Sequence, residues 1–187
     1  QNKATYSAFQ IYHRIKSRCG DTKDNDNIGR CYDDVTMCQE WLDNSKSFVK
    51  WYLEHCYDVD GDWMDVDKDL FGKGAKVYSP ENCCILPHKL NSMLANCKKK
   101  YREGKTTNNT LPLGIHYNVV LKKYYGEVCL FGEEKPTQLS MWDTPEEAFA
   151  EYKKIREAHM MMKILKYKDS IPEYIYKELL KVEVDPY

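Results

Sequence analysis

The 187-residue sequence lacks an apolar run long enough to span a bilayer, and its start has no signal-peptide pattern. These absences predict a cytoplasmic protein with no membrane partner. No internal repeat or low-complexity tract is present, which excludes a repeat architecture. The formal net charge of −1 excludes the strongly basic composition that by itself indicates nucleic-acid binding.

Paired metal-binding motifs are also absent, although the chain has 8 cysteines. Zinc sites usually combine C-x2-C pairs, whereas the spacings here are irregular, and Cys83 and Cys84 cannot easily share one tetrahedral site. The chain is too long and too rich in core residues to need a disulfide scaffold. The cysteines are therefore interpreted as buried free thiols in a reducing cytoplasm.

Charge is unevenly distributed along the chain. Residues 20–69 contain 14 acidic and 5 basic side chains, whereas residues 88–125 contain 8 basic side chains and only Glu103 as an acid. The basic stretch "CKKKYREGK" could contact phosphates or form a solvated surface, and charge alone favours the solvated surface.

The first half of the chain predicts helices followed by two short strands. Apolar spacing predicts a helix over 6–19, and the aromatic residues of 36–58 are typical of packed helices with an N-cap at Asn44 or Ser45. "DWMDVDKDLF" and "CCILP" indicate strands, and 88–104 a helix with a basic end. "EGKTTNNTLP" is a linker, so the predicted domains are 1–104 and 105–187.

The second half predicts three antiparallel strands, in "LGIHYN", "KKYYGEVCLF" and "TQLSMWD", because apolar residues alternate there. A long helix follows, with Thr144 as N-cap, Pro145 at its first position and Glu147 closing a capping box. "IPEYIYKELLKV" predicts a terminal helix. Together these patterns predict an α+β fold.

Two groups of motifs resemble those of phage-type proteins in which an HNH-like endonuclease domain precedes an AP2-like DNA-binding domain. "VDKD…KVYSPENCCILPHKLNS" and the upstream "YDDVTMCQEWLDNSKSF" resemble the HNH part. "PLGIHYN…KYYGEV…LSMWDTPEEAFAEYKK" is similar to the AP2 pattern, and the resemblance covers most of Tyr6 to Lys154. It implies a ββα-metal domain with N-terminal helices, then a three-stranded sheet packed on a helix.

The resemblance assigns roles to several residues. Asp67, Asn82 and His88 match catalytic positions, and Asp67, Asp69 and His88 match positions that would hold Mg²⁺ or Mn²⁺ in an active enzyme. Asp65 lies two residues before Asp67 and points to the same side of the strand.

The sequence departs from the family pattern at two positions. Asp67 stands where the first catalytic His is expected, and an Asp is a weaker base at neutral pH unless its pKa is raised. Ala75 stands where similar proteins carry Asn. Asn82 has an alternative role in shaping its loop, and His88, one turn before Asn91, has an alternative as a helix-start residue without a ligand.

An AP2-like sheet is expected to lie in the major groove and to read bases with Arg and Trp, yet no Arg occurs from Leu111 to Ile155. Basic side chains of both halves are the candidates for nucleic-acid contacts: Lys68, Lys89, Lys98, Lys99, Lys100, Arg102, Lys122 and Lys123.

Three functions remain open at this point. The first is a metal-dependent HNH-type DNA endonuclease in the cytoplasm of a bacterial host. The second is a DNA-binding protein that keeps the nuclease fold without its chemistry. The third is a protein that sequesters a small nucleotide ligand between its domains, in a phage anti-defence role.

Overall fold

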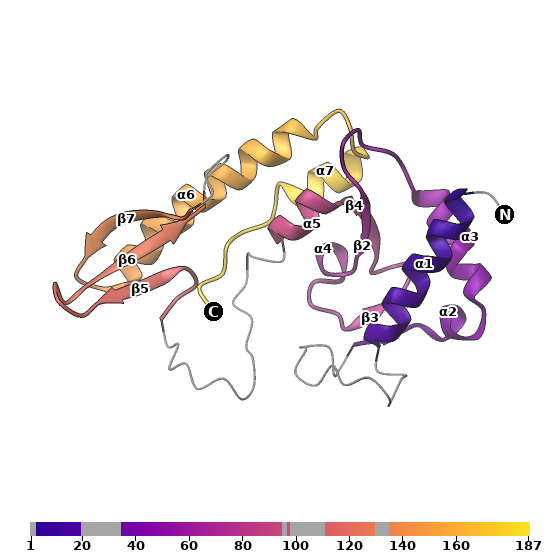
Figure 1. The fold of residues 1–187 in the computed structure, drawn as a ribbon, viewed down its shortest axis with the longest axis horizontal. Coiled ribbons are helices and arrows are strands. Elements are labelled where there is room, and N and C mark those ends of the chain that lie inside the picture. Colours follow the sequence, from indigo (N-terminus) through magenta and orange to yellow (C-terminus); the bar gives the residue numbers. More distant parts are fainter. Residues whose placement is uncertain (1–2, 20–34, 95–96, 98–110, 130–134) are drawn as a thin grey trace.

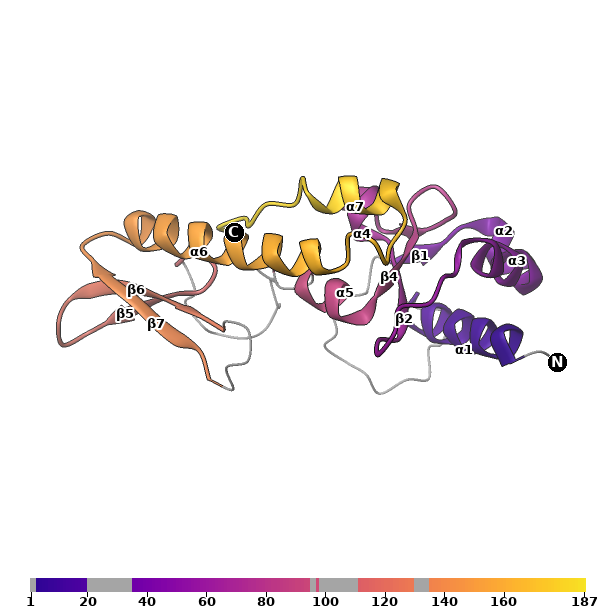
Figure 2. The same cartoon turned by 90° about the horizontal axis from the view of Figure 1, so that it is seen from above.

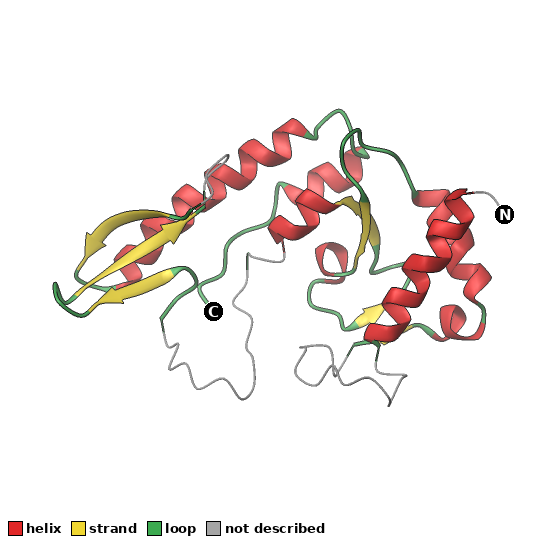
Figure 3. Cartoon of the chain, viewed as in Figure 1, coloured by secondary structure: helices red, strands yellow, loops and turns green. Residues whose placement is uncertain are grey.

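The computed structural model describes residues 3–19, 35–94, 97, 111–129 and 135–187. Within them the chain is α+β and has three small sheets, with the N-terminal helices at one end of the molecule and the three-stranded sheet at the other (Figures 1 and 3). The elements in chain order are α1 (Lys3–Arg18), β1 (Thr36–Met37), α2 (Gln39–Asp43), α3 (Ser45–His55), β2 (Met64–Asp67), α4 (Asp69–Gly72), β3 (Val77–Tyr78), β4 (Cys84–Pro87), α5 (His88–Leu94), β5 (Ile115–Asn118), β6 (Lys123–Val128), β7 (Thr137–Trp142), α6 (Pro145–Lys166) and α7 (Glu173–Leu179).

Helices α1, α2 and α3 pack around an aromatic core, as their sequence predicts. Trp41 and Phe48 are fully buried, and their rings meet edge to face with centroids 5.0 Å apart. Asn44 begins α3 by accepting the backbone N–H of Lys46, so the predicted N-cap is confirmed at this residue.

Strands β2 and β4 form an antiparallel pair, and α5 starts directly where β4 ends. Asp65 lies opposite Leu86, and Asp67 lies opposite Cys84. The segment between the two strands contains α4 and β3, and β3 pairs in parallel with β1. The sequence predicts a strand through Phe71, whereas β2 ends at Asp67 and residues Asp69–Gly72 form α4.

The β2–β4 pair lies between two hydrophobic cores, because successive side chains of a strand face opposite ways. Val66 and Ile85 pack with the aromatic core of α1–α3. Cys84 and Leu86 face the other core, which α5, α6 and α7 help to form. Strands β2 and β4 therefore form a hairpin with a long connection, which contains α4 and β3, and this hairpin joins the two halves of the molecule.

The predicted three-stranded sheet is confirmed, with strand order β5-β6-β7 and α6 packed on one face. The capping box of α6 also forms as predicted: Thr144 accepts the backbone N–H of Glu147, whose carboxylate accepts the N–H of Thr144. Gly114 has a φ of 72°, and a Cβ there would lie 2.5 Å from the ring of Tyr152, so only glycine fits where this helix meets the sheet.

Helix α6 extends from the three-stranded sheet to the region of α5 and α7 (Figure 2). Residues from both sides of the predicted 104/105 boundary share its core, and the Cys97 thiol lies 3.5 Å from Met160 Sδ. Residues 98–110, which include that boundary, lie outside the described residues. The hydrophobic cores thus divide at β2–β4, upstream of the predicted linker.

Among the described residues, no helix has the length and apolar character needed to cross a membrane. No disulfide joins any two of the seven described cysteines.

Candidate functional site

The most chemically distinctive cluster lies where β2 begins and β4 passes into α5. Asp65 Oδ2 accepts hydrogen bonds from His88 Nδ1 at 2.7 Å and from Asn91 Nδ2 at 3.0 Å. The hairpin register explains the meeting, because Met64 pairs with Pro87 and so brings Asp65 beside the first turn of α5. His88 and Asn91 are three residues apart and share one face of the helix.

Asp65 determines which ring nitrogen of His88 carries a hydrogen. An ionised carboxylate only accepts hydrogen bonds, so His88 Nδ1 must donate to it. The other nitrogen, Nε2, lies 3.2 Å from Ser92 Oγ. The carboxylate therefore keeps neutral His88 in the tautomer whose Nε2 carries a lone pair. This lone pair accepts a hydrogen bond from the Ser92 hydroxyl, and it is the position on the ring that can take up a proton.

Part of this cluster is open to solvent. The side chain of His88 is 40% exposed, whereas that of Asp65 is 22% exposed. The ring of Trp63 lies against His88 with centroids 4.5 Å apart, and Trp63 itself is 65% exposed. A fixed carboxylate, an accessible imidazole and an exposed aromatic surface therefore occur side by side.

Asp67 has a different environment at the other end of the same hairpin. It is 7% exposed, and its Oδ1 accepts the backbone N–H of Asp69 at 3.1 Å and of Leu70 at 2.8 Å. These bonds fix the start of α4, in the way a helix-capping side chain does. Burial raises the pKa of the Asp67 carboxyl to about 6, although the two N–H groups act in the opposite direction.

The structure does not bring the predicted residues Asp67, Asn82 and His88 together. His88 is four residues beyond Cys84, the partner of Asp67, which corresponds to roughly 13 Å at the rise of a strand. Asn82 Nδ2 donates to the carbonyl oxygen of Val77, so its described contact shapes the loop before β4. Asp65 takes the place beside His88 that the resemblance implies for Asp67.

The predicted metal ligands do not fit a common ion. Asp69 bonds to Lys68 Nζ, and Asp67 accepts two backbone N–H groups, while His88 lies at the far end of the hairpin. Throughout the described part of the chain, no three His, Cys, Asp or Glu side chains are grouped so that they could hold an ion. Dependence on Mg²⁺ or Mn²⁺ stays a prediction from the resemblance.

The predicted nucleic-acid contacts are mostly engaged or lie outside the described residues. Lys68 is buried beside Asp69, Lys89 donates to the carbonyl oxygen of Gly61, and Lys123 pairs with Asp143 at 3.0 Å. Lys122 is exposed in the β5–β6 turn, with a φ of 53°. The predicted contacts outside the described residues are Lys98, Lys99, Lys100 and Arg102.

Trp63 belongs to the site, but no pattern in the sequence predicts a functional role for it. For Asp65 and Asn91 a partial signal exists, since strand alternation places Asp65 on the face of Asp67, and helical spacing places Asn91 one turn after His88. The meeting of Asp65 with His88 follows from the strand register, which the sequence does not specify.

Comparisons with known proteins give no relative to set beside this geometry: no family model matches the chain, and neither a curated protein nor a solved structure does.

Proposed function

We propose that this protein hydrolyses phosphodiester bonds in DNA, with His88 as the general base and Asp65 as the residue that positions it. The observation that carries the proposal is the 2.7 Å hydrogen bond from His88 Nδ1 to Asp65, which leaves Nε2 on a side chain that solvent can reach. A histidine in this arrangement removes a proton from a water as the water oxygen attacks phosphorus. The P–O bond to the leaving oxygen breaks, and the leaving oxygen takes a proton from solvent to become the alcohol. Such proton transfer contributes about 10²–10⁴-fold to a rate.

The surroundings of His88 support a nucleic-acid substrate. Trp63 offers an exposed ring at the same place, and stacking of a base on an aromatic side chain contributes about 1–3 kcal/mol. Asn91 bonds the same Asp65 oxygen and so helps to hold the carboxylate in position.

The topology also supports the proposed HNH-like and AP2-like assignments, as analogies of fold. An antiparallel β2–β4 pair followed at once by α5 has the β-β-α order that the first resemblance implies. The β5-β6-β7 sheet with α6 on one face has the arrangement that the second implies. Fold alone does not establish chemistry, so the proposal depends on the geometry at His88.

A DNA-binding protein without nuclease activity is the second candidate. It is favoured by Asp67, which the resemblance assigns to catalysis but which is buried and bonded to the backbone at the start of α4. Sequestration of a small nucleotide stays a prediction.

Plasmid cleavage tests the proposal. The full chain is incubated with supercoiled plasmid in Mg²⁺, in Mn²⁺ and in EDTA, and nicking is followed over time for wild type, His88→Ala and His88→Asn. We expect both variants to lose 10²-fold or more of the nicking rate. His116→Ala is the matched control, because His116 is a half-exposed histidine on β5 that pairs with Glu127 at 3.6 Å.

The outcomes separate the two candidates. Cleavage lost in both His88 variants and kept in His116→Ala supports the nuclease. Undiminished cleavage by His88→Ala contradicts the assigned base. No cleavage by a folded wild-type protein that still retains duplex DNA in a gel-shift assay favours the binding protein.

A further inference from the structure

The strongest unassigned surface of the molecule is the outer face of α1. The sixteen residues of this helix include three Lys or Arg residues after its first turn, Arg14, Lys16 and Arg18, and no Asp or Glu at any position. This composition contrasts with residues 20–69, where acidic side chains outnumber basic ones 14 to 5. Because α1 has no acidic side chain, none of its own residues repels a phosphate, although the net charge of the chain is −1.

Helix α1 has two clearly different faces. Ala8, Ile11, Tyr12 and Ile15 are buried, and Tyr12 Oη donates to the carbonyl oxygen of Trp41. These contacts anchor the helix to the aromatic core, so its outer face is held in a fixed orientation. Because the apolar face of α1 is buried against this core, it is not exposed to insert into a lipid surface.

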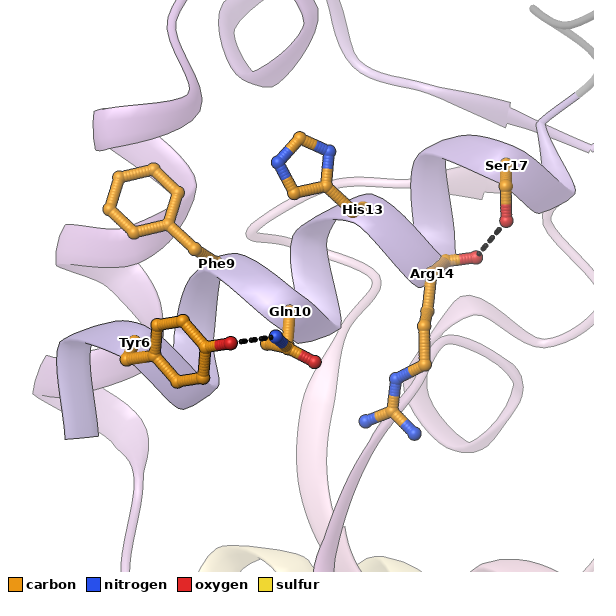
Figure 4. Close-up of a pocket in the computed structure, with 6 residues that line it drawn as sticks. All are labelled: Tyr6, Phe9, Gln10, His13, Arg14 and Ser17. Carbon is orange, nitrogen blue, oxygen red and sulfur yellow. Dashed lines mark hydrogen bonds between the residues drawn. The ribbon is translucent and has the colours of Figure 1, made fainter. Parts of the chain in front are cut away.

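The outer face carries hydrogen-bonding and aromatic side chains around a surface hollow of about 530 Å³ (Figure 4). The residues that line the hollow are Tyr6, Phe9, Gln10, His13, Arg14 and Ser17.

The polar groups of this face are well placed to bind a partner. Gln10 Nε2 donates to Tyr6 Oη at 2.7 Å, which holds both side chains in place, and the Ser17 hydroxyl donates to the backbone at Arg14 (Figure 4). The guanidinium of Arg14 makes no ion pair or hydrogen bond with any residue that the structure describes. It is exposed and available to a ligand.

We propose that α1 is a recognition helix that enters the major groove of duplex DNA and reads base edges with Arg14 and Gln10. An α-helix is about 10–12 Å across, and the major groove is about 12 Å wide. The line from Tyr6 to Ser17 is about 16 Å long at 1.5 Å per residue, close to the length of five base pairs.

The side-chain chemistry favours DNA over an acidic protein partner. Arginine donates two parallel hydrogen bonds to guanine, glutamine pairs in the same way with adenine, and serine bonds to either base. An acidic protein surface could be bound through positive charge alone, and such binding would give Gln10 no specific contact to make. This inference rests on the proposed function insofar as DNA is the polymer that the protein cleaves.

Sequence selection followed by a binding assay tests the inference. A preferred duplex is selected from a randomised pool with the 187-residue His88→Ala chain, which is expected not to cut it. Fluorescence anisotropy then compares the selected duplex with a scrambled one for Arg14→Ala, Gln10→Ala and Arg14→Lys, each made in that background. Lys50→Ala is the matched control, since it removes one exposed positive charge from α3.

We expect Arg14→Ala to weaken binding of the selected duplex by about 10- to 100-fold and binding of the scrambled duplex by only a few-fold. Gln10→Ala is expected to reduce the preference by about tenfold, and Arg14→Lys to keep scrambled-duplex binding while losing preference. Both positions are exposed, so unchanged thermal unfolding is expected and separates loss of contact from loss of fold.

Two different failures can be told apart. Arg14→Ala and Gln10→Ala that behave like Lys50→Ala, in a protein that binds and cleaves DNA, would overturn the role of α1 and leave the nuclease in place. A parent protein that binds no duplex, or only RNA, single strands or another protein, would overturn both proposals.

Discussion

The two ends of the β2–β4 hairpin present the same chemical group in opposite settings. Asp65 and Asp67 are two residues apart on one strand and point to the same face. Asp65 bonds to the side chains of His88 and Asn91 beside an exposed tryptophan. Asp67 is buried and bonds to backbone N–H groups at the start of α4.

The difference shows that the partner and the exposure of a carboxylate decide what it can do. A carboxylate that holds an accessible imidazole in one tautomer can take part in proton transfer. A carboxylate that satisfies the N–H groups of a buried helix end stabilises the local fold, since those groups would otherwise lack partners. We therefore expect substitutions at Asp65 to affect activity and substitutions at Asp67 to affect stability.

The largest expected effect is on catalysis by Asp65→Ala. The change removes the acceptor of His88 Nδ1, so the ring loses its fixed tautomer and orientation, and we expect kcat for plasmid nicking to fall by about 10²-fold or more. KM should change little, because Asp65 acts through His88. Asp67→Asn is expected to stay within about threefold of wild type. A larger rate loss in Asp67→Asn than in Asp65→Ala would reverse the assignment of the two carboxylates.

The next effect is the pH dependence of stability that Asp67 causes. Its pKa is about 6 in the folded protein against an ordinary 3.8, so the folded state binds the proton more tightly than the unfolded state. The contribution of Asp67 to stability is therefore greatest below about pH 4 and is lost as the pH rises through about 6. The full difference is on the order of 2–3 kcal/mol at 1.4 kcal/mol per unit of pKa.

Asp67→Asn tests this dependence. The amide oxygen of Asn can accept the N–H groups of Asp69 and Leu70 without a buried charge, so the variant should be at least as stable as wild type at pH 7.5. Urea unfolding at several pH values from 4 to 7.5 measures the difference between the two proteins. A difference that stays constant over this range would show that the Asp67 carboxyl does not titrate there.

Much of the fold could be predicted from local patterns. Alternation places the strands of the β5-β6-β7 sheet, and the sequence Thr144-Pro145-Glu146-Glu147 identifies the start of α6, because a capping box depends only on residues within one turn. The aromatic core of α1–α3 follows from helical spacing. Each of these features is determined by residues close together in the chain.

The site could be predicted only in part, because it depends on pairing between distant residues. The segment that joins β2 to β4 contains α4 and β3, so no tight turn fixes the register from which Asp65 meets His88. Asp67 likewise pairs with a distant residue, Cys84, whose side chain belongs to the core that α5, α6 and α7 help to form. The motif resemblance assigned the catalytic role to Asp67, whereas the pairing of β2 with β4 brings Asp65 to His88.

The smallest expected effect concerns a cap at the surface, which sharpens the contrast with Asp67. Thr144 Oγ1 accepts the backbone N–H of Glu147 at 3.3 Å in an exposed setting. Water can replace this bond, so Thr144→Ala should cost only about 1 kcal/mol of unfolding free energy, with DNA cleavage unchanged. Thr144→Ser keeps the hydroxyl and serves as the control in the same urea titration. A loss well above that size in Thr144→Ala, with Thr144→Ser unaffected, would mean that the start of α6 governs the packing of the whole β5-β6-β7 sheet.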